Sequence, residues 1–195
     1  MAHHLYHTQA IVIGHADRGD ANRAFYLLTR ELGLVVATAQ SIRHLKSKLR
    51  YHLQLGRIPS VTLVRGRETW RIVGAEAGED VSRLWRFSAG RRFIRSSFAL
   101  IRKLIHGEEH NPAVFELFTE AFRYVSADPA ARADSEAELI ITLRLLHHLG
   151  YLQADQRVLP LIKNNEWESE VLAQAKNRRE DLELLAKETL LSTHL

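Results

Sequence analysis

The chain has 195 residues, of which 46% are hydrophobic and 26% charged, and its formal net charge is +4. Because it contains no cysteine, disulfides, thiolate zinc sites and cysteine nucleophiles are excluded. No apolar run reaches the roughly 18 residues of a membrane span, and Met1–Tyr6 lacks the apolar core of a signal peptide. We therefore expect a soluble cytoplasmic protein with no membrane partner.

Charge is unevenly distributed along the chain. Residues 1–105 hold 18 Lys and Arg against 7 Asp and Glu, a net charge of +11, whereas residues 106–195 hold 9 against 16, a net charge of −7. Nucleic acid is the commonest partner of so basic a segment, although an acidic protein tail would also fit. The asymmetry predicts that the basic residues 1–105 carry the binding function and that the acidic residues 106–195 serve as a structural scaffold.

Five short segments near the N-terminus have the composition of β-strands. They are residues 8–14, 24–29, 34–39, 58–64 and 69–75. Turn-forming sequences separate them, such as Asp17–Asp20 after the first and Arg65–Glu68 between the last two. Short strands with tight turns between them predict a small closed barrel, for which an OB-fold is the obvious candidate.

A basic run, Arg43–Arg50, follows the third predicted strand. It holds Arg43, Lys46, Lys48 and Arg50 and no acidic residue. These charges repel one another unless an anion lies nearby, which favours a phosphate-sized target. The alternative is a solvated loop whose charges only aid solubility.

The rest of the chain has helical periodicity. Residues 90–105 have one apolar half and, opposite it, the basic residues Arg91, Arg92, Arg95, Arg102 and Lys103. No acidic residue shares that face, so it is either a phosphate-facing stripe or an ordinary solvated surface. Further helices are predicted over 112–126, 135–150 and 166–191. The fold class is therefore α+β, with an OB-fold barrel at residues 1–78 followed by an all-helical domain at 79–195.

His106–His110 fits the H-x-x-E-H pattern, in which two histidines four residues apart on a helix hold zinc. Gly107 within the motif and Pro112 after it oppose a helix there, so a chance match is favoured. No sequence pattern of a nucleophile with its base, a phosphate-binding loop or a dinucleotide site is present. We expect no enzyme activity, no cofactor and no metal.

Several phrases, in order, resemble the bacterial recombination mediator family RecO. They are Thr8–Gly14 as an opening strand, His15–Arg23 as a turn, Leu27–Gly33 as an L-T-x-x-x-G segment, Arg43–Arg50 as a basic loop, and His148–Leu152 as an L-G-Y phrase. Two features depart from the family pattern. Residues around Gly56 replace an L-Q-P-F continuation, and the four-cysteine zinc module of many members is missing, with residues 153–164 as a short bridge. The resemblance implies a compact, metal-free member.

The resemblance also implies the fold and the function. It implies an OB-fold followed by a helical domain and a non-enzymatic mediator that binds single- and double-stranded DNA and anneals complementary strands. Its partners would be RecR, the C-terminal tail of the single-stranded-DNA-binding protein SSB and, indirectly, RecA. No position matches the family's SSB-tail site closely, but Arg123 and Arg132 are candidates for its rim.

The predicted DNA-binding residues are basic side chains, since these neutralise phosphates and release counterions. They are Arg43, Lys46, Lys48, Arg50, Arg65, Arg67, Arg71, Arg91, Arg92 and Arg95. Tyr51 and Trp70 are candidates for base stacking, each with core or barrel packing as the alternative. Two other functions remain open: an OB-fold module that binds RNA, and an adaptor that docks acidic protein tails.

Overall fold

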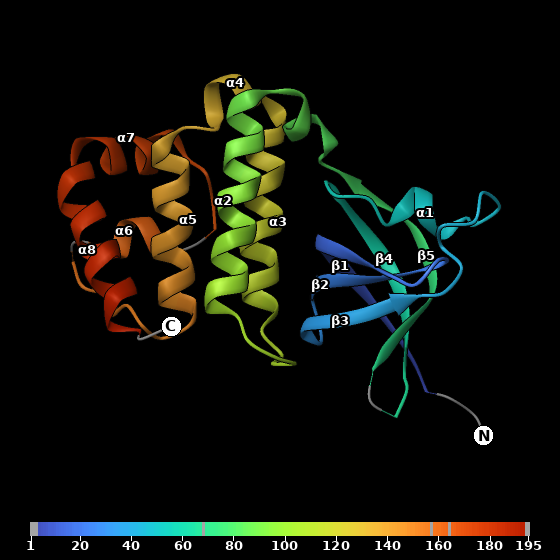
Figure 1. Cartoon of the computed structure of the whole chain (residues 1–195). Helices are drawn as coiled ribbons and strands as arrows, with labels where there is room; N and C mark the ends of the chain where they lie inside the picture. The colour runs from blue at the N-terminus through green and yellow to red at the C-terminus, as the bar shows by residue number, and fades with distance from the viewer. Residues whose placement is uncertain (1–3, 68, 157, 164, 194–195) are drawn as a thin grey trace. The chain divides into compact units, whose positions relative to one another are not determined.

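The computed structural model describes residues 4–67, 69–156, 158–163 and 165–193 (Figure 1). The chain divides into two compact units. The barrel unit comprises Met1–Ser82 and Ile105–Phe115, and the helical unit comprises Arg83–Leu104 and Glu116–Leu195. The barrel unit therefore includes a segment far beyond residue 78, where the sequence places the domain boundary. None of the helices in the described ranges is long and apolar enough to cross a bilayer.

The barrel unit is built from five strands that form a closed barrel in the order β1-β2-β3-β5-β4. The strands are β1 (Leu5–Arg18), β2 (Asn22–Thr29), β3 (Gly33–Ala39), β4 (Arg57–Arg65) and β5 (Trp70–Asp80). All neighbours pair antiparallel except β3 and β5, which are parallel. This confirms the predicted α+β class with an N-terminal OB-fold.

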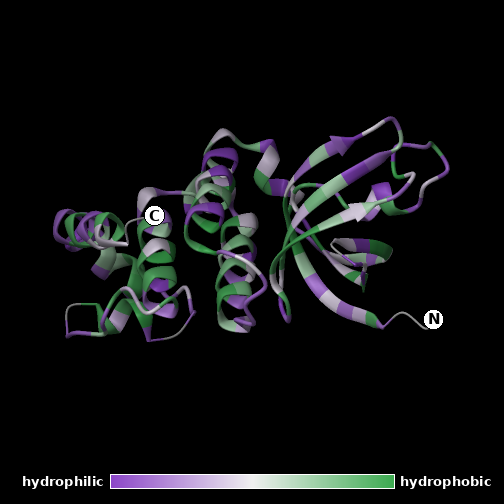
Figure 2. Cartoon of the chain, turned by 60° about the horizontal axis from the view of Figure 1, so that its bottom comes forward, coloured by the Kyte–Doolittle hydropathy of each residue, from purple (hydrophilic) through white to green (hydrophobic). Residues whose placement is uncertain are grey.

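Alternation of apolar and polar residues along the strands explains the barrel (Figure 2). Phe25, Leu27, Val35, Ala37 and Leu63 are almost completely buried and belong to one core cluster. Their neighbours along the strands turn to the other face, where Val36 and Tyr26 are exposed. A one-residue slip would reverse these faces, so burial of this core fixes the register of the strands.

Strand β1 has two partners and spans the length of the barrel. Its first part pairs with β4, from Leu5 opposite Val64 to Gln9 opposite Ser60. Its later part pairs with β2 and ends with Arg18 opposite Asn22. The β4–β5 turn and the β1–β2 turn therefore lie at opposite ends of β1.

The basic run lies between β3 and β4 and is mostly irregular. Only its last residues are helical, where α1 (Leu49–His52) begins. Backbone hydrogen bonding joins this loop to the β1–β2 turn, since the Arg43 amide donates to the Ala21 carbonyl over 3.2 Å. Ile42 and Leu53 on either side of the run belong to the barrel core and anchor both of its ends.

A second irregular segment, residues 105–111, packs on the barrel where β3 begins. The Leu34 amide donates to the Gly107 carbonyl over 3.0 Å. Gly33 has φ +69°, and a Cβ there would lie 2.4 Å from the backbone oxygen of Glu109, so only glycine fits. The H-x-x-E-H pattern therefore lies in a non-helical segment, and its two histidines do not face one side of a helix. No group of three metal-ligating side chains occurs in the described part of the chain.

The helical unit contains three long helices that run side by side (Figure 1). These are α2 (Ser88–Leu104), α3 (Pro112–Ala127), whose first residues belong to the barrel unit, and α5 (Ser135–His148). Phe93 and Phe98 of α2 meet Phe122 of α3 edge to face in the core. The remaining elements are η1 (Ser82–Arg86), α4 (Pro129–Arg132), α6 (Leu159–Ile162), α7 (Ser169–Asn177) and α8 (Arg179–Ser192), of which α8 is as long as α5.

The prediction of one long last helix over 166–191 is wrong, because α7 and α8 are separated at Arg178. Arg178 has φ −120° and ψ 23°, outside the helical region. The buried residues Val171 and Ala175 of α7 and Leu182 and Ala186 of α8 keep helical spacing across the break. Apolar periodicity therefore gives no signal of the interruption.

Candidate nucleic-acid interface

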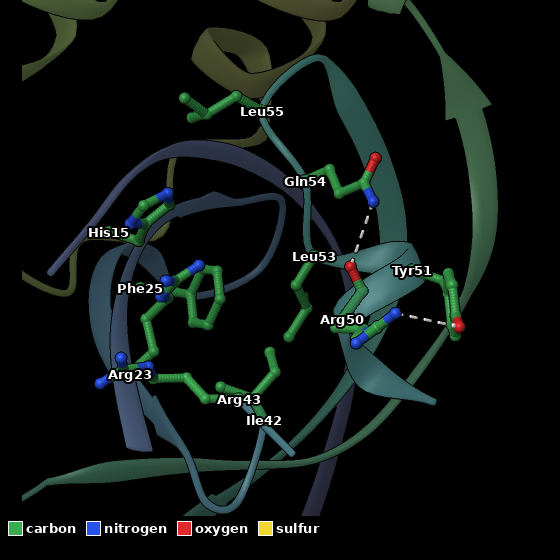
Figure 3. Close-up of a pocket in the computed structure, with 10 residues that line it drawn as sticks. All are labelled: His15, Arg23, Phe25, Ile42, Arg43, Arg50, Tyr51, Leu53, Gln54 and Leu55. Atoms are coloured by element: carbon green, nitrogen blue, oxygen red, sulfur yellow. Dashed lines mark hydrogen bonds between the residues drawn. The ribbon is translucent and has the colours of Figure 1, made fainter. Parts of the chain in front are cut away.

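A cavity of about 550 Å³ lies at the end of the barrel where the β1–β2 turn meets the basic run. We call it the barrel cavity. It is lined by His15, Arg23, Phe25, Ile42, Arg43, Arg50, Tyr51, Leu53, Gln54 and Leu55 (Figure 3). Three of these residues are arginines, and none of the ten is acidic. The lining side chains thus carry a net positive charge suited to an anion.

The floor of the barrel cavity is apolar. Phe25, Ile42 and Leu53 are core residues that also line it. In Figure 3 the Phe25 ring lies between the arginines of the β1–β2 side and the α1 side. These three side chains are at most 3% exposed, so the apolar surface that a ligand can reach comes from Leu55 and the Tyr51 ring. Such a surface beside arginines suits a ligand with both an anionic group and a flat apolar group.

Asp17 positions two of the cavity arginines from outside the cavity. Its carboxylate accepts a hydrogen bond from Arg23 Nε over 2.7 Å, and its other oxygen lies 3.8 Å from Arg43 Nη1. Arg43 Nη1 also donates to the Gly19 carbonyl over 3.1 Å. The hydrogen bond from Arg23 lowers the pKa of Asp17, so the carboxylate stays ionised at neutral pH.

On the other side, Arg50 and Tyr51 are paired. Arg50 Nη2 donates to the Tyr51 hydroxyl over 3.3 Å, and the guanidinium carbon lies 4.9 Å from the ring centroid. Gln54 Nε2 donates to the Arg50 carbonyl over 3.3 Å. Tyr51 remains 53% exposed, so its ring is accessible for stacking.

The pKa of His15 is lowered, first by partial burial and then by the neighbouring charge of Arg23. Its imidazole is therefore mostly neutral at pH 7 and becomes a further cation only in acid.

Of the predicted residues in the basic run, Arg43 and Arg50 line the barrel cavity, and Lys46 and Lys48 lie exposed on the loop beside it. The structure thus brings this predicted group together. Sequence reasoning missed His15, Arg23 and Gln54 as lining residues. His15 and Arg23 flank the β1–β2 turn, and the pairing of β1 with β2 was the available signal for their proximity.

Arg65, Arg67 and Arg71 lie around the β4–β5 turn, at the other end of β1 from the barrel cavity. Arg65 Nη1 is 2.8 Å from Glu108 Oε2, so its charge is compensated. Arg67 is exposed, and Arg71 is partly buried. The structure does not join these side chains to the basic run.

Trp70 is only 4% exposed and belongs to the barrel core. Its Nε1 donates to Glu108 Oε1 over 2.8 Å, and its ring meets Tyr6 edge to face at 5.0 Å. This environment corresponds to barrel packing, the alternative to base stacking for this residue.

Arg91, Arg92 and Arg95 lie on α2 in the helical unit. Arg91 Nη1 donates to the Trp85 carbonyl over 3.0 Å, and Arg92 Nε is 3.4 Å from Glu138 of α5. Arg95 is exposed. The basic face of α2 has no acidic residue of its own, but Glu138 of α5 pairs with it through Arg92.

The helical unit has a cavity of its own, of about 790 Å³. We call it the helical cavity. It is lined by Glu116, Glu120, Arg123, Tyr124, Ala127, Arg132, Asn165, Glu166 and Trp167. Arg123 and Arg132, the predicted rim residues, both line it. Arg123 pairs with Glu120, one turn earlier on α3.

Aromatic rings and guanidinium groups alternate beside the helical cavity. The Tyr124 and Trp167 rings stack at 4.8 Å, with Arg132 4.7 Å from the Tyr124 centroid and Arg144 5.1 Å from the Trp167 centroid. Arg144 is fully buried and donates to the carbonyls of Leu161 and Glu166, each over 2.7 Å. Burial lowers its pKa to about 10, so it stays charged at pH 7.

Two family models match the chain. The model "Recombination protein O N terminal" matches residues 1–78, and "Recombination protein O C terminal" matches residues 97–153.

Several proteins named "DNA repair protein RecO" are similar. That of Dehalococcoides mccartyi is 31% identical over 117 residues, 58% of this chain and 45% of the relative. That of Desulfitobacterium hafniense is 28% identical over 150 residues, 75% and 52% of the two chains. That of Heliobacterium modesticaldum is 29% identical over 151 residues, with the same shares. The chain spans about half the length of these curated relatives. From both family models and these relatives, the chain belongs to the recombination protein O (RecO) family.

Proposed function

We propose that this chain acts in DNA repair by binding single- and double-stranded DNA on the surface formed by the basic run and the adjoining barrel cavity. The observation that carries the proposal is the concentration of cations without a lining carboxylate: Arg23, Arg43 and Arg50 in the cavity, with Lys46 and Lys48 exposed beside it. Such a surface releases counterions from phosphates, and the accessible Tyr51 ring can stack on a base without reading sequence.

Annealing of complementary strands follows from the same surface. Two strands repel each other through their phosphates, and a basic surface that screens both raises their local concentration. The basic run provides exposed cations for a second strand while the cavity arginines hold the first. No chemical step is needed, so the chain would act as a mediator and not as an enzyme.

The test is annealing of two complementary labelled oligonucleotides, followed by energy transfer, with the strands bare or coated with the cognate SSB. The variant Lys46→Glu/Lys48→Glu/Arg50→Glu is expected to lose acceleration while its thermal unfolding changes little. A matched control is Lys163→Glu/Lys176→Glu/Lys187→Glu, since these exposed lysines of the helical unit give the same change in net charge.

The possible outcomes separate the candidate functions. Acceleration that survives in the triple variant of the basic run would contradict the assignment of this surface. Preference for RNA over DNA of equal length would favour an RNA-binding module. Absence of DNA binding at low salt, with tight binding of an acidic peptide, would favour an adaptor.

We further propose that the helical cavity receives the acidic, phenylalanine-ended tail of SSB, and that the chain works with RecR in replacing SSB by RecA. The tail proposal is supported by Arg132, which lies over the ring of Tyr124 in its stack with Trp167 and so offers a cation and an apolar surface together. Arg123, in its ion pair with Glu120, lines the same cavity. Arg132→Ala is expected to weaken binding of a labelled tail peptide several-fold. Unchanged affinity would contradict the placement.

A further inference from the structure

We propose that the barrel cavity holds one unpaired nucleotide of the bound strand, with its phosphate on the arginines and its base against the accessible side chains of Tyr51 and Leu55. This inference rests on the proposed function and adds a distinction within it. Single strands would use the cavity and the basic run, whereas duplex DNA would use the exposed basic run alone.

The size of the barrel cavity fits this assignment. Its volume of about 550 Å³ lies within the range of roughly 300–1,000 Å³ usual for small-molecule pockets. A base within a duplex is held by its partner and by two stacked neighbours. Such a base would have to leave the stack to enter the cavity, which costs a few kcal/mol, whereas an unpaired base loses little.

Two lining side chains provide accessible surface for a base. The Tyr51 ring is 53% exposed and Leu55 is partly exposed, whereas the core residues that line the cavity are at most 3% exposed. Each natural base has an apolar π-face, so such a surface accepts any of them. Gln54 places an amide at the cavity, which can both donate to and accept from a base edge.

The walls are organised for a phosphate before it arrives. Asp17 and the Gly19 carbonyl hold Arg43, Asp17 holds Arg23, and the Tyr51 hydroxyl holds Arg50. Guanidinium groups match phosphate oxygens in pairs, and prior orientation reduces the entropy lost on binding. The cavity therefore offers contacts for both the phosphate and the base of a nucleotide.

The experiment compares three fluorescent DNA probes at low salt: a thymidine strand, a strand of equal length with stable abasic sugars, and a duplex. The wild-type protein is expected to bind the thymidine strand about fivefold or more tightly than the abasic strand. Gln54→Trp, at an exposed lining position, fills the cavity and is expected to bring that ratio close to one. The duplex probe, whose contacts are the exposed lysines of the basic run, should lose much less affinity than the thymidine strand.

A matched control separates cavity filling from the stacking of an added indole. Leu45 is 82% exposed on the neighbouring loop and does not line the cavity. Leu45→Trp should therefore keep the wild-type ratio between the two strands.

Equal binding of thymidine and abasic strands by wild type, or an unchanged ratio in Gln54→Trp, would overturn the nucleotide pocket and leave DNA binding intact. Failure of all three probes to bind would overturn the proposed function itself.

Discussion

The barrel cavity and the helical cavity both place arginines beside aromatic rings, but they differ in their carboxylates. Arg23, Arg43 and Arg50 line the barrel cavity with no acidic neighbour on its walls. Arg123 and Arg132 share the helical cavity with three glutamates, Glu116, Glu120 and Glu166. The number of arginines is therefore a poor guide to polyanion binding, since the position of the carboxylates decides the local potential.

The cavities also differ in what holds their cations. In the barrel cavity, exposed ion pairs with Asp17, which does not itself line the cavity, orient Arg23 and Arg43. Beside the helical cavity, Arg144 is fully buried and donates to backbone carbonyls. The barrel-cavity arginines are thus placed to bind a ligand, whereas Arg144 stabilises the fold.

The largest expected effect is on Arg144. Arg144→Met removes two charge-assisted hydrogen bonds and leaves the Leu161 and Glu166 carbonyls without this donor. Each such bond contributes about 1.5–3 kcal/mol, so we expect a loss of about 3 kcal/mol in the free energy of unfolding, measured in urea. DNA affinity of the folded variant should not change. An unchanged free energy of unfolding, or a folded variant that no longer binds DNA, would contradict the structural role assigned to Arg144.

The next effect compares equal charge changes in the two cavities. Arg50→Glu is expected to reduce DNA affinity by about tenfold and to lower the slope of log K against log salt by about 1–2. Arg123→Glu carries the same charge change in the helical unit and should alter DNA affinity less than about twofold. Fluorescence anisotropy at several salt concentrations checks both. Equal losses would show that only net charge matters.

A smaller effect is expected from releasing a cation in the helical cavity. Glu120→Gln removes the ion pair with Arg123, and both side chains are about half exposed. Surface pairs contribute about 0.2–1 kcal/mol, so affinity for the acidic tail peptide should rise by about fivefold at most. Isothermal titration with the tail peptide measures the change, and DNA affinity is the internal control. A fall in peptide affinity would contradict the proposed role of Arg123.

The smallest effect is a pH dependence at His15. Its pKa is lowered below 6.5, so protonation on going from pH 7.5 to pH 5.5 adds a positive charge to the barrel cavity. DNA affinity should therefore rise in acid, by about twofold more in the wild type than in His15→Ala. The other histidines contribute equally to both proteins. Identical pH profiles would exclude His15 from the surface that contacts DNA.

Local sequence patterns predicted the five strands and helices α2, α3 and α5. Apolar residues recur at every second position in a strand and at every third or fourth position in a helix, so the sequence alone reveals these elements. The break at Arg178 was not predictable in this way, since the apolar spacing continues through it. The segment 105–111 was also hidden, because its contacts with Gly33 and Leu34 join residues more than 70 positions apart.

The candidate site was predictable only in part. Arg43 and Arg50 stand out as members of a basic run, but Arg23 and His15 are ordinary residues until the pairing of β1 with β2 places them at the same cavity. Arg65 was indistinguishable from the cavity arginines in sequence. Its ion pair with Glu108 depends on a tertiary contact across 43 positions.

The position of Glu108 has a consequence for the order in which the protein forms on the ribosome. Glu108 and Gly107 complete the barrel through contacts with Arg65, Trp70 and Leu34, yet they follow helix α2 in the chain. A nascent chain that has emerged only to Ser82 has all five strands but lacks these partners. The barrel is finished only after α2 has been synthesised, so a fragment cut at the end of β5 would be a weaker fold than the same strands in the whole chain.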